Sequence, residues 1–150
     1  VTILSMIGLF NIFGTLTSGY LAQKFSKKLI LSVIYLTRGL VIAVFIFSPP
    51  STFMAIFFGI TFGFLWLSTV PPTMGLVGFI FGTKYIGLLY GIVFLSHQIG
   101  SFFGAYLGGV FHDLYGSYDY AWYISIALSI FAGLIHLPII EKQVPRLQTT

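Results

Sequence analysis

The side chains that could carry out chemistry are few and widely separated in this sequence of 150 residues. The groups able to move a proton or bind a metal are three histidines and three acids: His97, His112, His136, Asp113, Asp119 and Glu141. They include no His-x-x-x-His pair, and the sequence contains no cysteine, so we predict no metal site and no thiolate chemistry. A phosphate-binding loop is also missing, and we therefore expect neither a cofactor nor direct use of ATP.

Two residues could instead act on a solute. The imidazole of His97 could bond a solute oxygen or change charge near neutral pH. Arg38 is a permanent cation in the middle of an apolar segment, where a charge is by default a functional hypothesis with a partner still to be named. A structural role is open for both residues. His97 could be neutral and bonded across a helix pair, and Arg38 could bond carbonyls, hydroxyls or the ring of Tyr35.

The segments that carry these residues are apolar and long. Apolar side chains make up 57% of the sequence and charged ones only 7%, whereas about a quarter of a soluble domain is charged. Five stretches reach the roughly 20 residues that a helix needs to cross the hydrocarbon layer: Val1–Ala22, Leu29–Ser48, Phe53–Phe81, Tyr85–Phe111 and Tyr120–Ile140. No stretch alternates between apolar and polar residues as barrel strands do, so we predict an all-α integral membrane protein with five transmembrane helices.

The charged residues predict an orientation in the bilayer. If the loop Gln23–Lys28 is cytoplasmic, simple alternation places the loop around Lys84 and the tail at residues 141–150 on the same side. The opposite loops then contain Asp113 and Asp119 and no basic residue, which is the charge bias expected in an inner membrane. The net charge of +4 therefore reports topology with a cytoplasmic C-terminus, and no nucleic-acid partner is predicted.

The end of the first stretch contains a recognisable loop signature. Residues 19–28 read GYLAQKFSKK, which resembles the pattern Gly-x-Leu-Ala-Asp-Arg-x-Gly-Arg-Lys of the major facilitator superfamily, found between helices two and three and again between eight and nine. The positions that carry the resemblance are Gly19, Leu21, Lys24 and Lys28. Gln23 replaces the usual Asp and Ser26 replaces the second Gly, so the charge relay of the family's stronger copy is not expected in this loop.

A second part of the chain resembles the same family. Phe81–Gly87 and the glycine-rich stretch after it are similar to the loop following helix ten and to helix eleven, so the whole chain resembles helices eight to twelve. The resemblance implies that residues 1–150 form most of a C-terminal six-helix bundle, with the missing N-terminal helices of the same protein and the lipid bilayer as partners. Pro71–Gly75 and His97–Gly100 are most similar to the prokaryotic branch related to monocarboxylate and oxalate/formate transporters, although Thr15 stands where that branch typically carries an Arg.

Small and polar residues recur on one face of two of the predicted helices. Gly100, Gly104 and Gly108 are spaced so that a partner helix could approach closely, either for static packing or for the rocking movements of a transporter. Asn11 and Thr15 belong to a polar strip on the first helix, which should face another helix or a water-filled cavity.

The third helix is interrupted by Pro71 and Pro72, which remove two backbone donors and predict a kink. The family resemblance implies that this helix lines the solute cavity, so the freed carbonyls near Trp66 and Ser68 become a plausible solute surface. The complete set of solute-binding candidates is Asn11, Thr15, Trp66, Ser68, His97 and Ser101.

The resulting hypothesis is part of a secondary active transporter, not an enzyme, that moves a small solute by alternating access, with an organic anion as one candidate. Two alternatives remain open. A membrane-embedded enzyme could use His97 or the pair of His112 and Asp113, but it would need a further acid, metal cluster or nucleophile. A noncatalytic membrane subunit would only pack against partner proteins.

Overall fold

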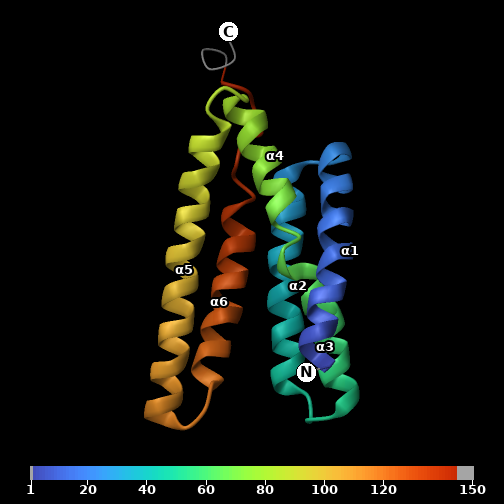
Figure 1. The fold of residues 1–150 in the computed structure, drawn as a ribbon, viewed down its shortest axis with the longest axis vertical. Helices are drawn as coiled ribbons and strands as arrows, with labels where there is room; N and C mark the ends of the chain where they lie inside the picture. Colours follow the sequence, from blue (N-terminus) through green and yellow to red (C-terminus); the bar gives the residue numbers. More distant parts are fainter. Residues whose placement is uncertain (1, 145–150) are drawn as a thin grey trace.

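A computed structural model describes residues 2–144 of the chain, and within them the fold is entirely helical (Figure 1). The helices are α1 (Thr2–Lys24), α2 (Lys27–Phe47), α3 (Thr52–Trp66), α4 (Val70–Phe81), α5 (Ile86–Tyr115) and α6 (Asp119–Ile135). Four helical segments are long and apolar enough to cross a membrane, and one of them, Thr52–Phe81, combines α3 with α4. With 17 residues, α6 has the minimum length for a span. The predicted all-helical membrane fold is confirmed.

The helices form two groups that meet at α2 (Figure 1). The most extensive contacts join α1 to α3 and α2 to α6. The buried apolar core lies where α2 and α3 meet and contains Val41, Ile42 and Phe58, with Trp122 of α6 packed against it. In contrast, α5 has no buried residue and packs mainly against α4 and α6.

Two glycines bring the backbones of α1 and α3 into close contact. A Cβ added to Gly14 would lie 1.8 Å from the carbonyl oxygen of Phe64, and one added to Gly63 would lie 2.6 Å from the Cα of Ile7. Only hydrogen fits at either position. Because lipid removes the hydrophobic drive between membrane helices, such close backbone approach is a main source of their packing energy.

The contact between α2 and α6 also depends on small residues. A Cβ on Gly133 would lie 2.6 Å from Cγ of Leu36, and one on Gly39 would lie 3.1 Å from Cβ of Ser129. The hydroxyl of Ser32 donates a hydrogen bond of 2.7 Å to the carbonyl of Gly133. This bond satisfies a buried hydroxyl and fixes how α6 sits on α2.

The third predicted span is broken rather than kinked. The helix stops at Trp66 and a new one starts at Val70, which places Pro71 and Pro72 in the first turn of α4. Proline is well tolerated there because first-turn N–H groups have no intrahelical partner and the ring sets φ for a helix. The prolines therefore start a helix here instead of bending one.

The last two predicted spans have different ends from those expected. α5 continues four residues beyond Phe111 to Tyr115, where Gly116 adopts a left-handed conformation with φ of 68° and ends the helix. α6 ends at Ile135 instead of Ile140, because Pro138 disfavours helix in the residue before it. After a turn the chain continues without regular structure to Val144, whose N–H donates to the carbonyl of Ile80 at 2.9 Å. The remainder of the predicted tail, residues 145–150, lies outside the described residues.

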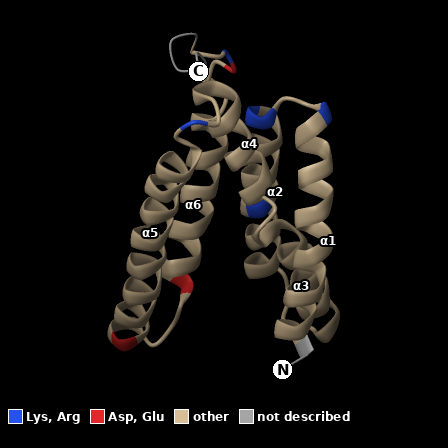
Figure 2. Ribbon diagram, turned by 45° about the horizontal axis from the view of Figure 1, so that its top comes forward, with Lys and Arg blue, Asp and Glu red and all other residues tan. Residues whose placement is uncertain are grey.

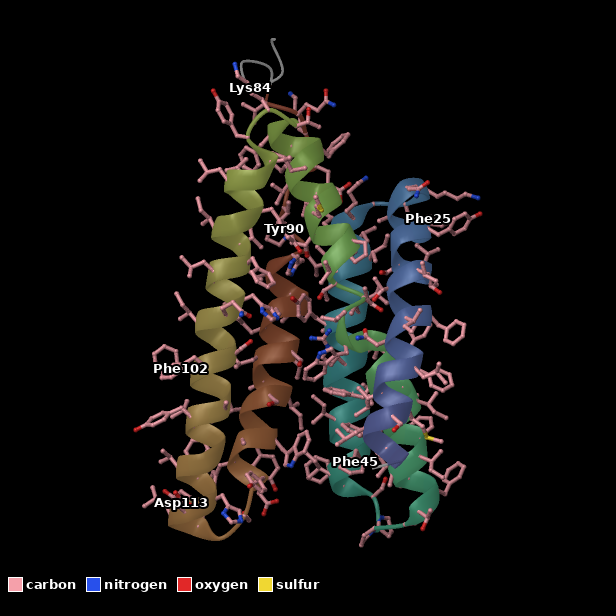
Figure 3. All side chains as sticks on the ribbon, in the orientation of Figure 1. Phe25, Phe45, Lys84, Tyr90, Phe102 and Asp113 are labelled. Carbon is pink, nitrogen blue, oxygen red and sulfur yellow. The ribbon has the colours of Figure 1, made fainter. Side chains whose placement is uncertain are left out.

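Basic residues gather at one end of the bundle and acidic residues mark the turn at the other (Figure 2). Lys24 ends α1 and Lys27 begins α2, while Figure 3 shows Lys84 and Asp113 at opposite ends of α5. One blue segment lies within α2, where Arg38 is the only charged residue between Lys28 and the end of the helix. The lysine-bearing loops thus lie at the end opposite the turn with Asp113 and Asp119, and which end faces the cytoplasm stays a prediction.

Candidate solute-binding groove

The break between α3 and α4 is held by polar side chains from two other helices. Arg38 of α2 donates from Nη2 to the carbonyl oxygens of Leu65 at 2.5 Å and Trp66 at 2.9 Å. From α1, the side-chain oxygen of Asn11 accepts a bond of 3.0 Å from the backbone N–H of Leu67. These contacts satisfy groups that a helix end leaves without partners, and a cation at a helix C-terminus also complements its dipole. We call Asn11 and Arg38 the break clamp.

The hydroxyls around the break bond to their own helix. Ser68 donates to the carbonyl of Phe64, and Thr73 donates to the carbonyl of Thr69 at 2.6 Å. Ser68 is almost fully buried, with 1% of its surface exposed. Its hydroxyl is therefore committed to the backbone and is not presented to a solute.

Two neighbouring cavities lie along α5, on the side that faces the rest of the bundle. One of about 270 Å³ is bounded by α4, α5 and Tyr35, and includes Thr69, Thr73 and Tyr90. Figure 3 shows Tyr90 on α5 beside α4. The other, of about 530 Å³, lies between α2, α5 and α6. Tyr35 and His97 line both cavities, which are therefore adjacent, and we call the two together the central groove.

The second cavity of the central groove contains the charge embedded in the bundle. It is lined by Arg38 from α2, by His97 and Ser101 from α5, and by Ser125 and Ser129 from α6. All of these side chains have polar atoms, and no Asp or Glu lines either cavity. Apolar side chains such as Ile42, Phe62 and Leu128 complete the wall, so the groove is mixed in character, and Arg38 is the one fixed charge among its described lining residues.

Arg38 has hydrogen-bonding capacity that the described residues do not use. Its Nε is buried and has no hydrogen-bond partner among them. The guanidinium lies 5.2 Å from the ring centroid of Tyr35, and that ring stacks on His136 at 5.3 Å. Arg38 thus holds the break through Nη2, while its Nε is buried without a partner among the described residues.

His97 lies at the junction of the two cavities. Its ring stacks on Phe94 with centroids 5.9 Å apart, and its Nδ1 is 3.3 Å from the side-chain oxygen of Gln98. The hydroxyl of Ser101 donates to the carbonyl of His97 at 3.0 Å. The imidazole therefore borders both cavities.

The sequence candidates are divided between two sides of the break. Arg38, His97 and Ser101 come together in the central groove. Asn11 and Thr15 instead line a separate cavity of about 310 Å³ beside Leu67.

Neither Ser68 nor Trp66 is among the lining residues of the central groove. Trp66 packs edge-on against Phe62 with ring centroids 5.0 Å apart. The polar strip of α1 and the polar face of α5 therefore do not form one site within the described residues.

The glycine face of α5 meets no other helix among the described residues. A Cβ added to Gly100, Gly104 or Gly108 would have no atom within 4 Å. Gly100 borders the second cavity of the central groove, and Phe102, which lies about 200° round the helix from it, projects away from the bundle (Figure 3). The close-packing role predicted for these glycines therefore depends on a partner outside residues 2–144 and remains a proposal.

Sequence reasoning missed the contribution of α6 to the groove. Ser125 and Ser129 are four residues apart and so lie on the same face of a helix, and Ala132 continues that face along the second cavity. Small and hydroxyl residues at this spacing in an apolar helix are the signal that identifies such a face.

The loop signature is connected to the chain after α6. The carboxylate of Glu141 accepts bonds from the backbone N–H of Lys28 and from the hydroxyl of Ser26, the latter at 3.0 Å. The ammonium of Lys28 donates to the carbonyl of Leu137 at 3.0 Å. An acid at the N-terminus of α2 complements the helix dipole. In this loop, where Gln23 replaces the signature Asp, Glu141 supplies a carboxylate from another segment.

At the other end of the bundle His112 and Asp113 lie 4.0 Å apart, far along α5 from His97. No group of three or more metal-ligating side chains occurs in the part of the chain that the structure describes. The pair is exposed and lines none of the groove cavities.

Comparison with known proteins assigns this sequence to a family. The sequence profile of the Major Facilitator Superfamily matches residues 2–149. The chain is 28% identical over 149 residues to the "Uncharacterized MFS-type transporter YcxA" of Bacillus subtilis (strain 168), and the match covers 93% of this chain and 36% of that protein. No solved structure gives a significant match. Because the profile covers nearly the whole sequence, the chain belongs to the Major Facilitator Superfamily of membrane transporters.

Proposed function

We propose that this chain forms part of a secondary active transporter that moves a small solute across the membrane by alternating access. Family membership supports transport as the general activity. The observation that carries the finer proposal is the central groove, in which Arg38 and His97 line a partly polar space between two groups of membrane helices. Transporters bind solute near the bilayer midplane between bundles that rock against each other, and the groove has the chemistry for such a site.

The proposed place of the chain is helices eight to twelve, in the C-terminal half of the transporter. In support, the chain spans 36% of the length of the curated relative it matches. The exposed glycine face of α5, where added Cβ atoms meet nothing, would then pack against helices of the other parts of the protein. The clustered lysines favour an inner-membrane protein whose C-terminus is cytoplasmic.

For the solute we propose an organic anion. Arg38 is the one fixed charge of the groove, no carboxylate lines either cavity, and its Nε lacks a partner among the described residues. An anion bound beside Arg38 would offset its charge in a low-dielectric site, where an unpaired charge is expensive. His97 would supply a second donor and a group that gains or loses a proton with the solute.

Thermal stabilisation of the purified full-length protein tests this proposal. The probes are acetate, lactate and oxalate, with glucose and choline as neutral and cationic comparisons. A ligand at about 100 times its Kd stabilises the protein by about 2.7 kcal/mol. We expect at least one of the anions to stabilise the wild type and to lose this effect in His97→Ala.

The matched control for this experiment is His112→Ala, which removes an exposed imidazole at the opposite end of α5 and should keep the response. An equal loss in both variants, or stabilisation by glucose or choline alone, would contradict an anion site in the groove. Stabilisation only by a separate protein subunit would favour a noncatalytic role instead.

A further inference from the structure

An apolar crevice runs between α1 and α2 on the far side of the break from the central groove. Its volume is about 270 Å³, and α3 forms its floor through Phe64 and Leu65. The two wall helices contact each other sparsely, which leaves the crevice between them. Val33 of α2 lines it with 62% of its surface exposed. The crevice therefore opens toward the hydrocarbon of the bilayer.

Three of the four hydroxyl side chains that line the crevice donate to backbone carbonyls. Thr17 donates to the carbonyl of Phe13 at 2.7 Å, and Ser18 donates to the carbonyl of Thr15 at 3.1 Å. Ser68 bonds the preceding helical turn in the same way. Because their donors are satisfied within their own helices, these residues present carbon to the crevice. An occupant at membrane depth must therefore be hydrocarbon.

Both walls of the crevice end in a lysine at the same end of the bundle. On α1 the lining residues Gly14, Thr17 and Leu21 are followed, at the same helical spacing, by Lys24. On α2 the lining residues Ile30, Ile34 and Thr37 are preceded at that spacing by Lys27. Residues three and four apart share a helix face, so each lysine lies one turn beyond the crevice on the face that forms its wall.

The two lysines have no acidic partner in the described part of the chain. The ammonium of Lys24 bonds the hydroxyl of Tyr20 and lies 4.4 Å from its ring centroid, and that of Lys27 lies 5.2 Å from the ring of Phe79. Neither forms a salt bridge within residues 2–144. Each lysine thus begins one turn beyond the crevice wall, with its ammonium against a neighbouring ring and with no acid to compensate its charge within residues 2–144.

We propose that this crevice binds one anionic phospholipid, with its phosphate between Lys24 and Lys27 and one acyl chain along the crevice. From Leu21 to Gly14 the wall extends about 10 Å along the helix axis, which is a large part of the roughly 15 Å half-thickness of a bilayer core. The lipid would thus enter in its normal orientation, with its head group at the lysine end. Basic residues between membrane helices are a known recognition element for anionic head groups.

The experiment measures lipid binding to the purified full-length protein by native mass spectrometry, with phosphatidylglycerol and phosphatidylcholine of the same acyl chains. We expect phosphatidylglycerol to bind preferentially. Removing both charges in Lys24→Gln/Lys27→Gln should weaken its binding about 30-fold, since each lysine near anionic lipid contributes about fivefold. Val33→Trp should fill the crevice and abolish binding of this lipid at unchanged surface charge.

Matched controls separate this site from general attraction and from misfolding. Lys84→Gln/Lys142→Gln removes two lysines from the same end of the bundle, and Leu40→Trp adds the same ring at another exposed position of α2. Both should bind lipid as the wild type does. If Val33→Trp fails to fold, Thr17→Trp fills the crevice from the other wall.

Equal binding of the two lipids would overturn the proposal, as would wild-type binding in both crevice-filled variants. Equal losses in the two double-glutamine variants would indicate diffuse attraction and would also overturn it. If inorganic phosphate displaces phosphatidylglycerol and Val33→Trp leaves the binding of this lipid unchanged, the two lysines form a site for a free anion rather than for a lipid.

Discussion

Replacing Asn11 with leucine should destabilise the protein through the break between α3 and α4. The side-chain oxygen of Asn11 is the partner of the backbone N–H of Leu67 at 3.0 Å, and leucine has nearly the same size but no acceptor. A buried donor left without a partner costs about 1–3 kcal/mol, while side-chain hydrogen bonds within membranes average about 0.6 kcal/mol and reach about 1.7 kcal/mol. We therefore expect a loss of about 1–2 kcal/mol in the free energy of unfolding.

The assay is unfolding of the full-length protein by sodium dodecyl sulfate in mixed micelles, followed by tryptophan fluorescence. Trp66 ends α3 at the break and reports on it directly. Thr17→Leu is the matched control, because it also converts a polar residue of α1 to leucine but removes only a bond within that helix. Equal effects of Asn11→Leu and Thr17→Leu would refute a special role for the break.

A double-mutant cycle tests whether the break clamp acts as a unit. Arg38→Met removes the donor to Leu65 and Trp66 and keeps an apolar stem. Because Asn11 and Arg38 hold the same three-residue interruption, their effects should not add, and we expect a coupling of about 0.5–3 kcal/mol. Additive losses would mean that each residue stabilises the bundle independently of the other.

Three further substitutions should differ in how much they lower the free energy of unfolding. Gly14→Ala forces a Cβ to 1.8 Å from the Phe64 carbonyl, so it should cost about 3 kcal/mol or more and lower the yield of folded protein in detergent. Gly104→Ala meets no atom among the described residues, but because this face is proposed to pack against helices of the other parts of the protein, the added methyl should cost about 1–3 kcal/mol in the full-length protein; a change of less than about 0.5 kcal/mol would mean that the face is not closely packed there. Glu141→Gln removes the anion that caps α2 at Lys28 and should lower the free energy of unfolding by about 1 kcal/mol. Chemical denaturation measures this loss. An unfolding curve indistinguishable from that of the wild type would contradict the prediction.

The membrane fold could be predicted from the sequence because it depends on composition and length. Long apolar stretches between lysine-bearing loops can form few structures other than helices in a bilayer. The predicted helices therefore lie close to the observed ones in the sequence. The helix ends were harder to predict. Pro71 and Pro72 are compatible both with a kink and with the first turn of a new helix, and only the contacts of Arg38 and Asn11 at the break decide for the second.

The site could be predicted only in part, since it depends on which helices become neighbours. Arg38 and His97 each stood out as unusual in an apolar helix, but their sharing of one cavity follows from the packing of α2, α5 and α6. Which glycines contact a neighbouring helix is equally hard to predict from the sequence. Gly14 touches a neighbouring backbone and Gly104 touches nothing, although both occur in similar small-residue patterns.

The central claim is that the groove beside Arg38 and His97 is a water-accessible solute path inside the membrane. Labelling with a membrane-impermeant thiol reagent tests it most directly, using single cysteines in a cysteine-free form of the full-length protein in sealed vesicles. Ser101→Cys lines the groove, and Leu40→Cys is exposed on α2 outside it. We predict that Ser101→Cys reacts with reagent added from either side, while Leu40→Cys, which faces lipid, does not react. If the folded Ser101→Cys protein reacts with reagent added from neither side of the membrane, the groove is not a water-accessible path.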